Sequence, residues 1–367
     1  MVHVRRAGEL NAARYGIVGS GWRTGAFVRL AQRMPDRFTV TGIVTRSAER
    51  GEQVEAEWRV PTFRRIDDLL AAEPVDFVIT SVPHTVTPDA IRAVVAHDTV
   101  VLAETPPAGD LEALRLLWAD VGASHLVQVA EQYPFSPGNV ARRLLIGDGV
   151  LGAPTWAQVS STQQYHAVAL LRSMLGVGFE PAQVSARAFR LPVVDPQSRA
   201  GWSDHLDPVE LVSTLATIDF GGKVGVYDYT DNHVRNPVRA NRMLVRGTHG
   251  ELADDHVTRL VAPQAPVASP LNRWHTGDYL SFEERDLYNI SFDGRVLYEN
   301  PYFGASLSDE DIAVATLLEK TASFSRGDGD APYPLASAAQ DHLIAMAITE
   351  SARTGSDVST LAEAWAS

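Results

Sequence analysis

A short glycine-containing stretch near the start of the chain could hold the phosphates of a dinucleotide. Gly19 and Gly21 follow the apolar run 15–18, and apolar residues at helical spacing begin directly after them. A strand, a glycine turn and a helix in this order form the context that the dinucleotide-binding fingerprint requires. Gly19 would permit the tight turn, and Gly21 would let the backbone approach a pyrophosphate at the helix N-terminus. Because Thr24 replaces the third glycine, an ordinary strand–helix turn is the alternative interpretation.

The end of the second predicted strand, 38–45, carries the residues that choose between the two nicotinamide dinucleotides. Thr45 stands at the position where a carboxylate would bind the ribose hydroxyls, and Arg46 follows it. Without the carboxylate a 2′-phosphate is not repelled, and an adjacent arginine can bind it. The sequence therefore favours NADP(H) over NAD(H). The competing interpretation is that Arg46 is a solvated residue at a helix start.

The composition of the chain excludes several classes of function. A length of 367 residues predicts about two domains. The net charge of −13 argues against nucleic acids and anionic membrane surfaces as partners. The chain has no cysteine, which excludes thiolate nucleophiles, zinc–thiolate sites and iron–sulfur clusters. Residues 1–13 lack the apolar core of a signal peptide, and no long apolar run follows, so we expect a soluble, cytoplasmic protein.

The first 130 residues alternate short apolar runs with helical patterns. Apolar runs such as 75–81 and 100–103 are typical of buried strands, and a helical pattern follows each of them. Strands that alternate with helices at short intervals indicate a parallel sheet with helices on both faces. We therefore predict an α/β fold that begins with a dinucleotide-binding domain of six strands at residues 1–130.

The second half of the chain has a different pattern. Long extended segments predominate, and residues 209–220 alternate apolar and polar side chains with period two. We therefore predict a second domain at 131–367, with a largely antiparallel sheet and two final helices at 309–324 and 336–353. A broad sheet with one face uncovered by helices usually meets a partner, and a second copy of the chain is the simplest candidate.

Several short motifs follow one another in an order that resembles a known family. They are Gly19-Ser20-Gly21, Ser81-Val82-Pro83-His84, Ala103-Glu104-Thr105-Pro106, Gly149-Val150-Leu151-Gly152, and His166 with Gly176 ten residues later. With these motifs the chain resembles the glucose–fructose oxidoreductase / inositol dehydrogenase / MocA (Gfo/Idh/MocA) family of NAD(P)-dependent oxidoreductases. The resemblance implies a Rossmann domain followed by an α+β domain with a large open sheet. It also implies a homodimer or homotetramer in which subunits meet through that sheet.

The chain departs from this family at two of the usual catalytic positions. The family's Glu-Lys-Pro motif aligns on residues 104–106, so Thr105 stands where the lysine is expected. The family's Asp-x-x-x-His pair aligns on Thr162 and His166, so the aspartate is absent and the histidine is kept. The family often has a cis peptide before the proline of the first motif, which makes Thr105–Pro106 a candidate.

The remaining histidine is the side chain best suited to acid–base chemistry. Oxidation of an alcohol by a nicotinamide needs a base for the hydroxyl proton, and a threonine hydroxyl cannot serve as one. His166 can, because the ordinary pKa of imidazole lies near neutral pH. The alternative is a hydrogen-bonded core histidine. We predict that His166 is the acid/base, that Thr105 positions substrate or nicotinamide, and that Tyr165 could relay a proton.

These arguments give a list of expected binding residues. Those expected to bind the cofactor are Gly19, Ser20, Gly21, Trp22, Arg23, Thr45, Arg46, Ser81, Val82, Pro83, His84, Glu104, Thr105 and Gln132. Those expected to bind substrate are Tyr133, Gln163, His166 and Arg172. We predict no metal site, because adjacent residues in the extended segment 254–256 (Asp-Asp-His) point in opposite directions.

Two functions are compatible with this sequence. The first is an NAD(P)-dependent oxidoreductase that transfers a hydride to or from a sugar, cyclitol or related small carbonyl or polyol substrate. The second, suggested by the missing lysine and aspartate, is a non-catalytic sensor that binds NADP(H) or a sugar. Chemistry that recycles a bound nicotinamide within one turnover is a third possibility.

Overall fold

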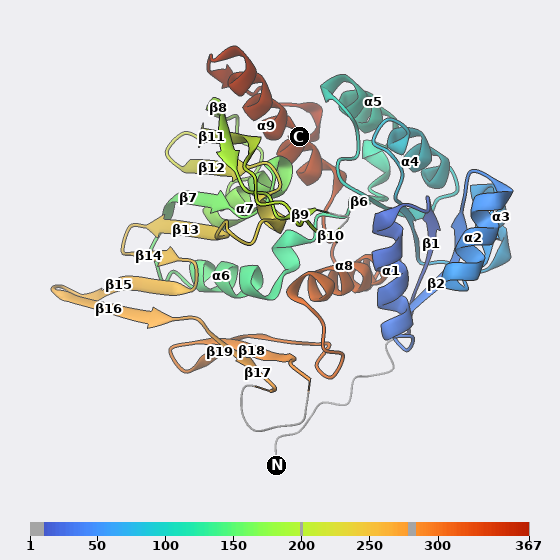
Figure 1. Ribbon diagram of the computed structural model, residues 1–367, viewed down its shortest axis with the longest axis horizontal. Helices are drawn as coiled ribbons and strands as arrows, with labels where there is room; N and C mark the ends of the chain where they lie inside the picture. The colour runs from blue at the N-terminus through green and yellow to red at the C-terminus, as the bar shows by residue number, and fades with distance from the viewer. Residues whose placement is uncertain (1–10, 199–200, 278–283, 367) are drawn as a thin grey trace. The chain divides into compact units, whose positions relative to one another are not determined.

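The computed structural model describes residues 11–198, 201–277 and 284–366 (Figure 1). These residues form two compact units. The first comprises the chain up to Ala130 together with Val314–Leu335, and the second comprises Glu131–Ala313 with the residues from Ala336 onward. The segment 314–335 thus joins the first unit, although the sequence analysis assigned it to the second domain. Most of the segment 1–13, to which the signal-peptide prediction refers, lies outside the described residues.

Within the described residues, the first unit is built on a parallel sheet in the order β3-β2-β1-β4-β5-β6. Its strands are β1 (Ala13–Val18), β2 (Phe38–Val44), β3 (Thr62–Phe63), β4 (Phe77–Thr80), β5 (Val100–Ala103) and β6 (Val127–Val129). The helices between them are α1 (Trp22–Arg33), α2 (Ala48–Trp58), α3 (Ile66–Ala72), α4 (Thr87–Val95) and α5 (Leu111–Val121). The six-stranded parallel sheet of the sequence prediction is confirmed.

The strand order of this sheet reverses between β1 and β4. From β1 the chain builds outward to β2 and β3, and then returns to place β4 on the other side of β1. In open α/β sheets, ligands bind beyond the carboxyl ends of the strands at such a switch point. The residues that follow β1 and β4, including Gly19 and Ser81, therefore lie at this switch point.

The strands of the first unit are apolar because helices cover both faces of the sheet. Tyr15, Ile17 and Ile79 are fully buried. The returning segment joins this unit through ion pairs, in which Arg326 binds Asp76 at 2.6 Å. These contacts explain why residues 314–335 belong here, and no local pattern in the sequence could have predicted them.

The second unit contains a nine-stranded sheet in the order β16-β15-β14-β13-β7-β12-β11-β8-β20. Its strands are β7 (Pro154–Ser160), β8 (Gln183–Val193), β11 (Val209–Asp219), β12 (Val224–Thr230), β13 (Arg242–Gly247), β14 (Gly250–Ala253), β15 (His256–Ala262), β16 (Ala265–Pro270) and β20 (Val358–Ser359). Only β7 and β12 pair in parallel within it. Two smaller sheets consist of β9 (Gln197–Ser198) with β10 (Gly201–Trp202), and of β17 (Asn272–His275), β18 (Leu287–Phe292) and β19 (Arg295–Glu299). The predicted large, mostly antiparallel sheet is confirmed.

Three long helices belong mainly to the second unit in the described part of the chain. They are α6 (Pro137–Gly147), α7 (Gln164–Leu175) and α9 (Leu335–Thr354), whereas most of α8 (Asp309–Ser325) belongs to the first unit. Helix α7 packs on β7 and β12, and its residues from His166 to Arg172 are all buried. It ends at Gly176, whose left-handed conformation (φ 61°) suits a residue without a side chain.

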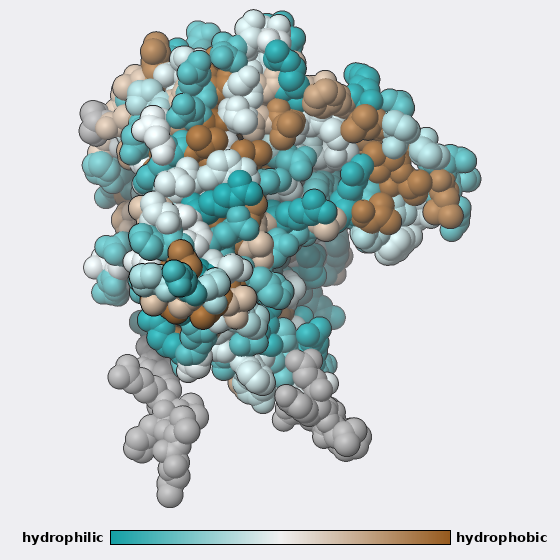
Figure 2. Space-filling view, turned by 90° about the vertical axis from the view of Figure 1, so that its left-hand side faces the viewer, coloured by the Kyte–Doolittle hydropathy of each residue, from teal (hydrophilic) through white to brown (hydrophobic). Residues whose placement is uncertain are grey.

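The large sheet also exposes apolar side chains. On β11, Ala216 and Ile218 are buried and Thr217 between them is exposed, as the period-two pattern predicts. Leu215, on the same face as Thr217, is about half exposed. Phe189 and Leu191 of the neighbouring β8 lie on the same face as Leu215 by strand register, and both are exposed. Figure 2 shows apolar surface gathered in separate patches on the side that carries β13–β16 in Figure 1.

Candidate active site

The glycine loop of the first unit is held in a tight turn. Gly19 has φ +109°, and a β-carbon built on it would lie 2.1 Å from the carbonyl oxygen of Ser81. Its amide donates to Val44 O at 3.0 Å, so the loop is fixed between the ends of β1, β2 and β4. Gly21 caps α1, and a β-carbon there would meet nothing within 4 Å. The N-terminus of α1 is thus open at the place where the fingerprint requires a phosphate.

Thr24, which replaces the third glycine, stabilises the same loop. Its hydroxyl donates to the carbonyl oxygen of Gly19 at 3.1 Å, and its side chain is buried. The substitution therefore preserves the turn rather than destroying it.

The predicted residues beyond β4 and β5 lie at the carboxyl ends of those strands. Ser81 donates its amide to Val18 O at 2.8 Å, and His84 lies in the exposed turn before α4. Glu104 forms an ion pair with Arg23 at 3.0 Å, and both side chains are 17% exposed. Glu104 is thus already bound to the first turn of α1. The peptide bond between Thr105 and Pro106 is cis, as the family motif predicts.

Three arginines surround the end of β2, where the sequence predicted only Arg46. Arg46 is exposed, and Thr45 beside it is buried. Arg64, which follows β3, donates to the hydroxyl of Thr45 and at 3.1 Å to that of Thr62. Gly51 leaves room for Arg64, because a β-carbon on residue 51 would lie 2.0 Å from the Arg64 guanidinium.

The third arginine connects this region to the glycine loop. Arg50 of α2 donates to the Ser20 hydroxyl at 3.0 Å and to the Ser20 carbonyl oxygen at 2.7 Å. Sequence reasoning missed Arg50 and Arg64, because the pairing of β3 with β2 and the packing of α2 bring them to this place. Arg64 therefore contacts Thr45, the position that lacks a carboxylate, whereas Arg50 contacts the glycine loop.

His166 of the second unit lies at the beginning of α7 in a cluster of aromatic and acidic side chains. Its Nδ1 is 2.6 Å from Oε2 of Glu131, and both residues are buried. The ring centroid of Tyr133 lies 4.8 Å from that of His166, and the ring of Tyr165 lies 4.4 Å away. Burial raises the pKa of Tyr133 to about 12, and the side chain of Thr162 is hydrogen-bonded to it. Tyr133 is therefore a neutral phenol at neutral pH.

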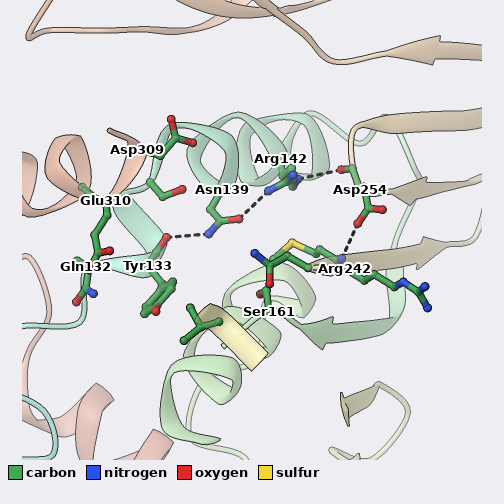
Figure 3. Close-up of a pocket in the computed structure, with 14 residues that line it drawn as sticks. Gln132, Tyr133, Asn139, Arg142, Ser161, Arg242, Asp254, Asp309 and Glu310 are labelled. Atoms are coloured by element: carbon green, nitrogen blue, oxygen red, sulfur yellow. Dashed lines mark hydrogen bonds between the residues drawn. The ribbon is translucent and has the colours of Figure 1, made fainter. Parts of the chain in front are cut away.

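A cavity of about 260 Å³ opens beside Tyr133 within the second unit (Figure 3). It is lined by Gln132, Tyr133, Ser136, Asn139, Arg142, Ser161, Val234, Asn241, Arg242, Met243, Asp254, Asp309, Glu310 and Ala313. Its wall is fixed by a chain of hydrogen bonds, in which Asn139 donates to Tyr133 O and accepts from Arg142, each at 2.9 Å. Arg142 continues the chain to Asp254 O at 3.0 Å.

Two residues expected to bind substrate have other surroundings. Arg172 is buried, and its guanidinium binds Asp341 of α9 at 2.5 Å and the carbonyl oxygens of Gly178 and Ser337. These contacts make it an anchor between α7 and α9, and we leave it out of the substrate site proposed below. Gln163 is an exposed residue that precedes α7.

In the acidic segment at 254–256, Asp254 and Asp255 form a turn and His256 begins β15. Asp254 has φ +53°, and its carboxylate accepts from the amide of Met243 at 2.8 Å. Asp255 is paired with Arg142 at 2.8 Å. Among the described residues, no group of three or more acidic or histidine side chains is placed to hold a metal ion. A search of the same residues finds no helix with the length and apolar character needed to cross a membrane.

The fold and these sites define a dinucleotide-binding class of protein, with a Rossmann domain followed by an α+β domain on a large open sheet. Residues 13–131 match the GFO_IDH_MocA family model, described as an oxidoreductase family with an NAD-binding Rossmann fold. Residues 13–131 are therefore similar to the Gfo/Idh/MocA family of NAD-binding oxidoreductases, as the motifs predict.

Solved structures of similar fold cover nearly the whole chain. Levoglucosan dehydrogenase in complex with NADH and levoglucosan has 17% identity and a TM-score of 0.66, covering 95% of this chain and 99% of its own. An oxidoreductase from Agrobacterium radiobacter in complex with NAD+, L-tartaric acid and magnesium has 16% identity and a TM-score of 0.66, covering 96% and 98%. A myo-inositol dehydrogenase from Corynebacterium glutamicum has 15% identity and a TM-score of 0.64, covering 95% and 99%. No curated protein matches the chain.

Proposed function

We propose that the chain is an NADP(H)-dependent oxidoreductase that acts on a sugar, a cyclitol or a related small carbonyl or polyol. The observation that carries the proposal is the position of Tyr133, whose ring lies against His166 and which also lines the cavity. If His166 acts as the acid–base group, the many hydrogen-bonding side chains of this cavity would suit a polyhydroxylated substrate. Similar folds occur in levoglucosan and myo-inositol dehydrogenases, which supports the same substrate class.

The residues of the first unit fit a nicotinamide dinucleotide. The backbone at Gly19–Gly21 and the N-terminus of α1 would bind the pyrophosphate. Arg46 and Arg64 would bind the 2′-phosphate of NADP(H), and Arg50 would hold Ser20 in place. When bound, the nicotinamide supplies the hydride acceptor or donor. NAD(H) stays an alternative, because the family is described only as NAD-binding.

The residues of the second unit would handle the substrate and its proton. In the oxidative direction, His166 would take the hydroxyl proton of the substrate while the hydride leaves the carbinol carbon. In the reductive direction it would return the proton to the carbonyl oxygen. Tyr133 stays neutral and can donate a hydrogen bond, and Gln132 would contribute a further amide at the cavity. Thr105 and Tyr165 keep the positioning and relay roles that the sequence suggested.

The test is a substrate screen with purified full-length protein. We expect NADPH-dependent reduction of at least one carbonyl, or NADP+-dependent oxidation of a polyol. His166→Ala should lower kcat by about 10²- to 10⁴-fold, the usual contribution of general acid–base catalysis, and leave the NADPH dissociation constant unchanged. Absence of turnover with both nicotinamides across the screen would contradict the proposal.

The second candidate is a non-catalytic sensor of NADP(H) or a sugar. It is favoured by Thr105 and Thr162, which stand where the family carries a lysine and an aspartate. Binding of NADPH without turnover, and a change in the stability of the protein on binding, would be its signature.

We further propose that the chain forms a homodimer or homotetramer through the exposed face of the large sheet. The support is the apolar group Phe189, Leu191 and Leu215 on that face. Phe189→Asp should lower the molar mass measured by light scattering to that of a smaller assembly, whereas Leu361→Asp, at an exposed site outside this group, should not. A molar mass of 39.9 kDa for the unaltered protein would exclude an oligomer. A cytoplasmic location is part of the same proposal.

A further inference from the structure

Glu131 is the only residue whose carboxylate contacts His166 in the described part of the chain. Its Oε2 lies 2.6 Å from the imidazole Nδ1, and its side chain is 3% exposed. Its Oε1 accepts a hydrogen bond from the amide of Tyr133 at 3.3 Å. Burial of a carboxylate costs free energy unless hydrogen bonds or an opposite charge compensate it. Glu131 and His166 therefore act together as a hydrogen-bonded pair.

We propose that Glu131 is a positioning residue that fixes the proton of His166 on Nδ1 and leaves Nε2 as the reactive nitrogen. A carboxylate can only accept at Nδ1, so the neutral imidazole must carry its proton there. The rings of Tyr133 and Tyr165 limit the rotation of the imidazole. The inference rests on the proposed function for its catalytic meaning, although the protonation state itself can be measured without a substrate.

This arrangement supplies a carboxylate that this chain lacks at position 162, where the family motif has an aspartate. Thr162 is a hydrogen-bond partner of Tyr133. Glu131, which precedes His166 by 35 residues in the sequence, contacts the imidazole. A negative charge at Nδ1 also stabilises the imidazolium that forms when Nε2 accepts a proton. In the oxidative direction the O–H bond of the substrate would break and its proton would move to Nε2 as the carbonyl forms. A bound nicotinamide would supply the acceptor for the hydride from the carbinol carbon.

The groups that face His166 come from several elements. Glu131 and Tyr133 precede α6, and Tyr165 is its neighbour on α7. His342 of α9 packs against Tyr165 with ring centroids 5.8 Å apart. Among these, Glu131 is the acidic group in direct contact with the imidazole, and it is therefore the one to change.

The experiment compares the full-length protein with Glu131→Gln and Glu131→Asp. The imidazole nitrogens are observed by 15N NMR of protein labelled at its 11 histidines, and His166→Gln identifies the resonances of residue 166. We expect a protonated Nδ1 and an unprotonated Nε2 in the unaltered protein. In Glu131→Gln the side-chain amide can donate to Nδ1, so the population with the proton on Nε2 should rise.

The kinetic part of the experiment separates positioning from folding. Glu131→Gln should lower kcat by about 10²- to 10⁴-fold with KM changed less than about threefold, because the wrong nitrogen carries the proton. Glu131→Asp should keep part of the activity. Asp286→Asn is the matched control, because it makes the same change at a buried carboxylate that binds Asn300 and Gly304. It should alter neither kcat nor the His166 resonances.

Either of two results would overturn the role of Glu131. One is a proton on Nε2 of His166 in the unaltered protein, and the other is an unchanged proton distribution in Glu131→Gln. If the substrate screen fails, the proposed function fails, and the NMR comparison alone still decides whether Glu131 sets the state of His166.

Discussion

The carbonyl oxygen of Ser81 occupies the place that a side chain on Gly19 would need. A β-carbon on residue 19 would lie 2.1 Å from this oxygen, and the backbone of Gly19 has φ +109°. Two strands that are distant in sequence, β1 and β4, thus come together at their carboxyl ends and leave room for backbone alone. The glycine is required by this packing even before any ligand is considered.

Gly19→Ala should therefore unfold more easily and lose dinucleotide binding. The positive φ costs on the order of 1–3 kcal/mol for a residue with a side chain, and the close contact adds to it. Thermal denaturation and NADPH titration measure the two effects. Gly147→Ala is the control for stability, because its β-carbon would meet nothing within 4 Å. Gly21→Ala has the same open surroundings, so it should fold normally and weaken only the binding of NADPH.

Arg64→Ala should reduce the preference for NADPH over NADH. A hydrogen bond to a charged group contributes about 1.5–3 kcal/mol, which corresponds to a rise of about 10- to 150-fold in the NADPH dissociation constant. The constant for NADH should change little, because NADH has no 2′-phosphate. Arg65→Ala is the matched control, since Arg65 is exposed and paired with Asp67. An equal loss of affinity for NADPH and NADH in Arg64→Ala would contradict the assignment of Arg64 to the 2′-phosphate.

Tyr133→Phe should make the protein less sensitive to alkali. Burial raises the pKa of Tyr133 to about 12, whereas an unfolded tyrosine titrates near 10. Tyr133 thus keeps its phenol proton to a higher pH in the folded state than in the unfolded state. The resulting contribution of Tyr133 to the free energy of unfolding is fully present below pH 10 and is lost as the pH rises to about 12. Denaturant unfolding at pH 8, 10 and 11 should show a smaller loss in the variant, by about 1.4 kcal/mol at pH 11.

Tyr288→Phe is the control for this pH series, because Tyr288 is 44% exposed. It should lose stability between pH 8 and 11 as the unaltered protein does. An identical pH dependence for Tyr133→Phe and Tyr288→Phe would contradict the assigned burial of Tyr133.

Arg172→Ala should destabilise the protein without a specific effect on the reaction. Its removal leaves Asp341 buried without its cation, and such losses cost about 3–5 kcal/mol. Arg353→Ala removes a similar pair on the surface, where both partners are exposed, and should leave the stability nearly unchanged. Chemical denaturation measures both. If Arg172→Ala instead raised KM and left the stability unchanged, this result would support Arg172 as a substrate-binding residue.

The sequence predicts those features of the fold that depend on neighbouring residues. The turn at Gly19 and the period-two pattern around Leu215 are local, and both appear in the structure. The return of residues 314–335 to the first unit depends on contacts such as that between Arg37 and Glu319, which are 282 positions apart. No periodicity or motif signals such a contact.

The residues of the candidate site also divide into those that a local motif predicts and those that only contacts between distant residues bring together. The motif around His166 could be found in the sequence, but its partner Glu131 could not, because 35 residues separate them and the intervening chain must fold first. Arg64 was hidden for a similar reason, since the pairing of β3 with β2 brings it to Thr45. Arg172 has the spacing of a ligand-binding residue on a helix, yet its contact with Asp341 makes it part of the core.

The hydrogen bonds from Arg50 to Ser20 have a consequence for the thermodynamics of coenzyme capture. They hold the loop in one conformation before any phosphate arrives, so little conformational entropy is left to lose on association. We expect a rapid, rigid association with a small change in heat capacity. In Arg50→Ala the same loop would first have to become ordered, and calorimetry would record a less favourable entropy of binding.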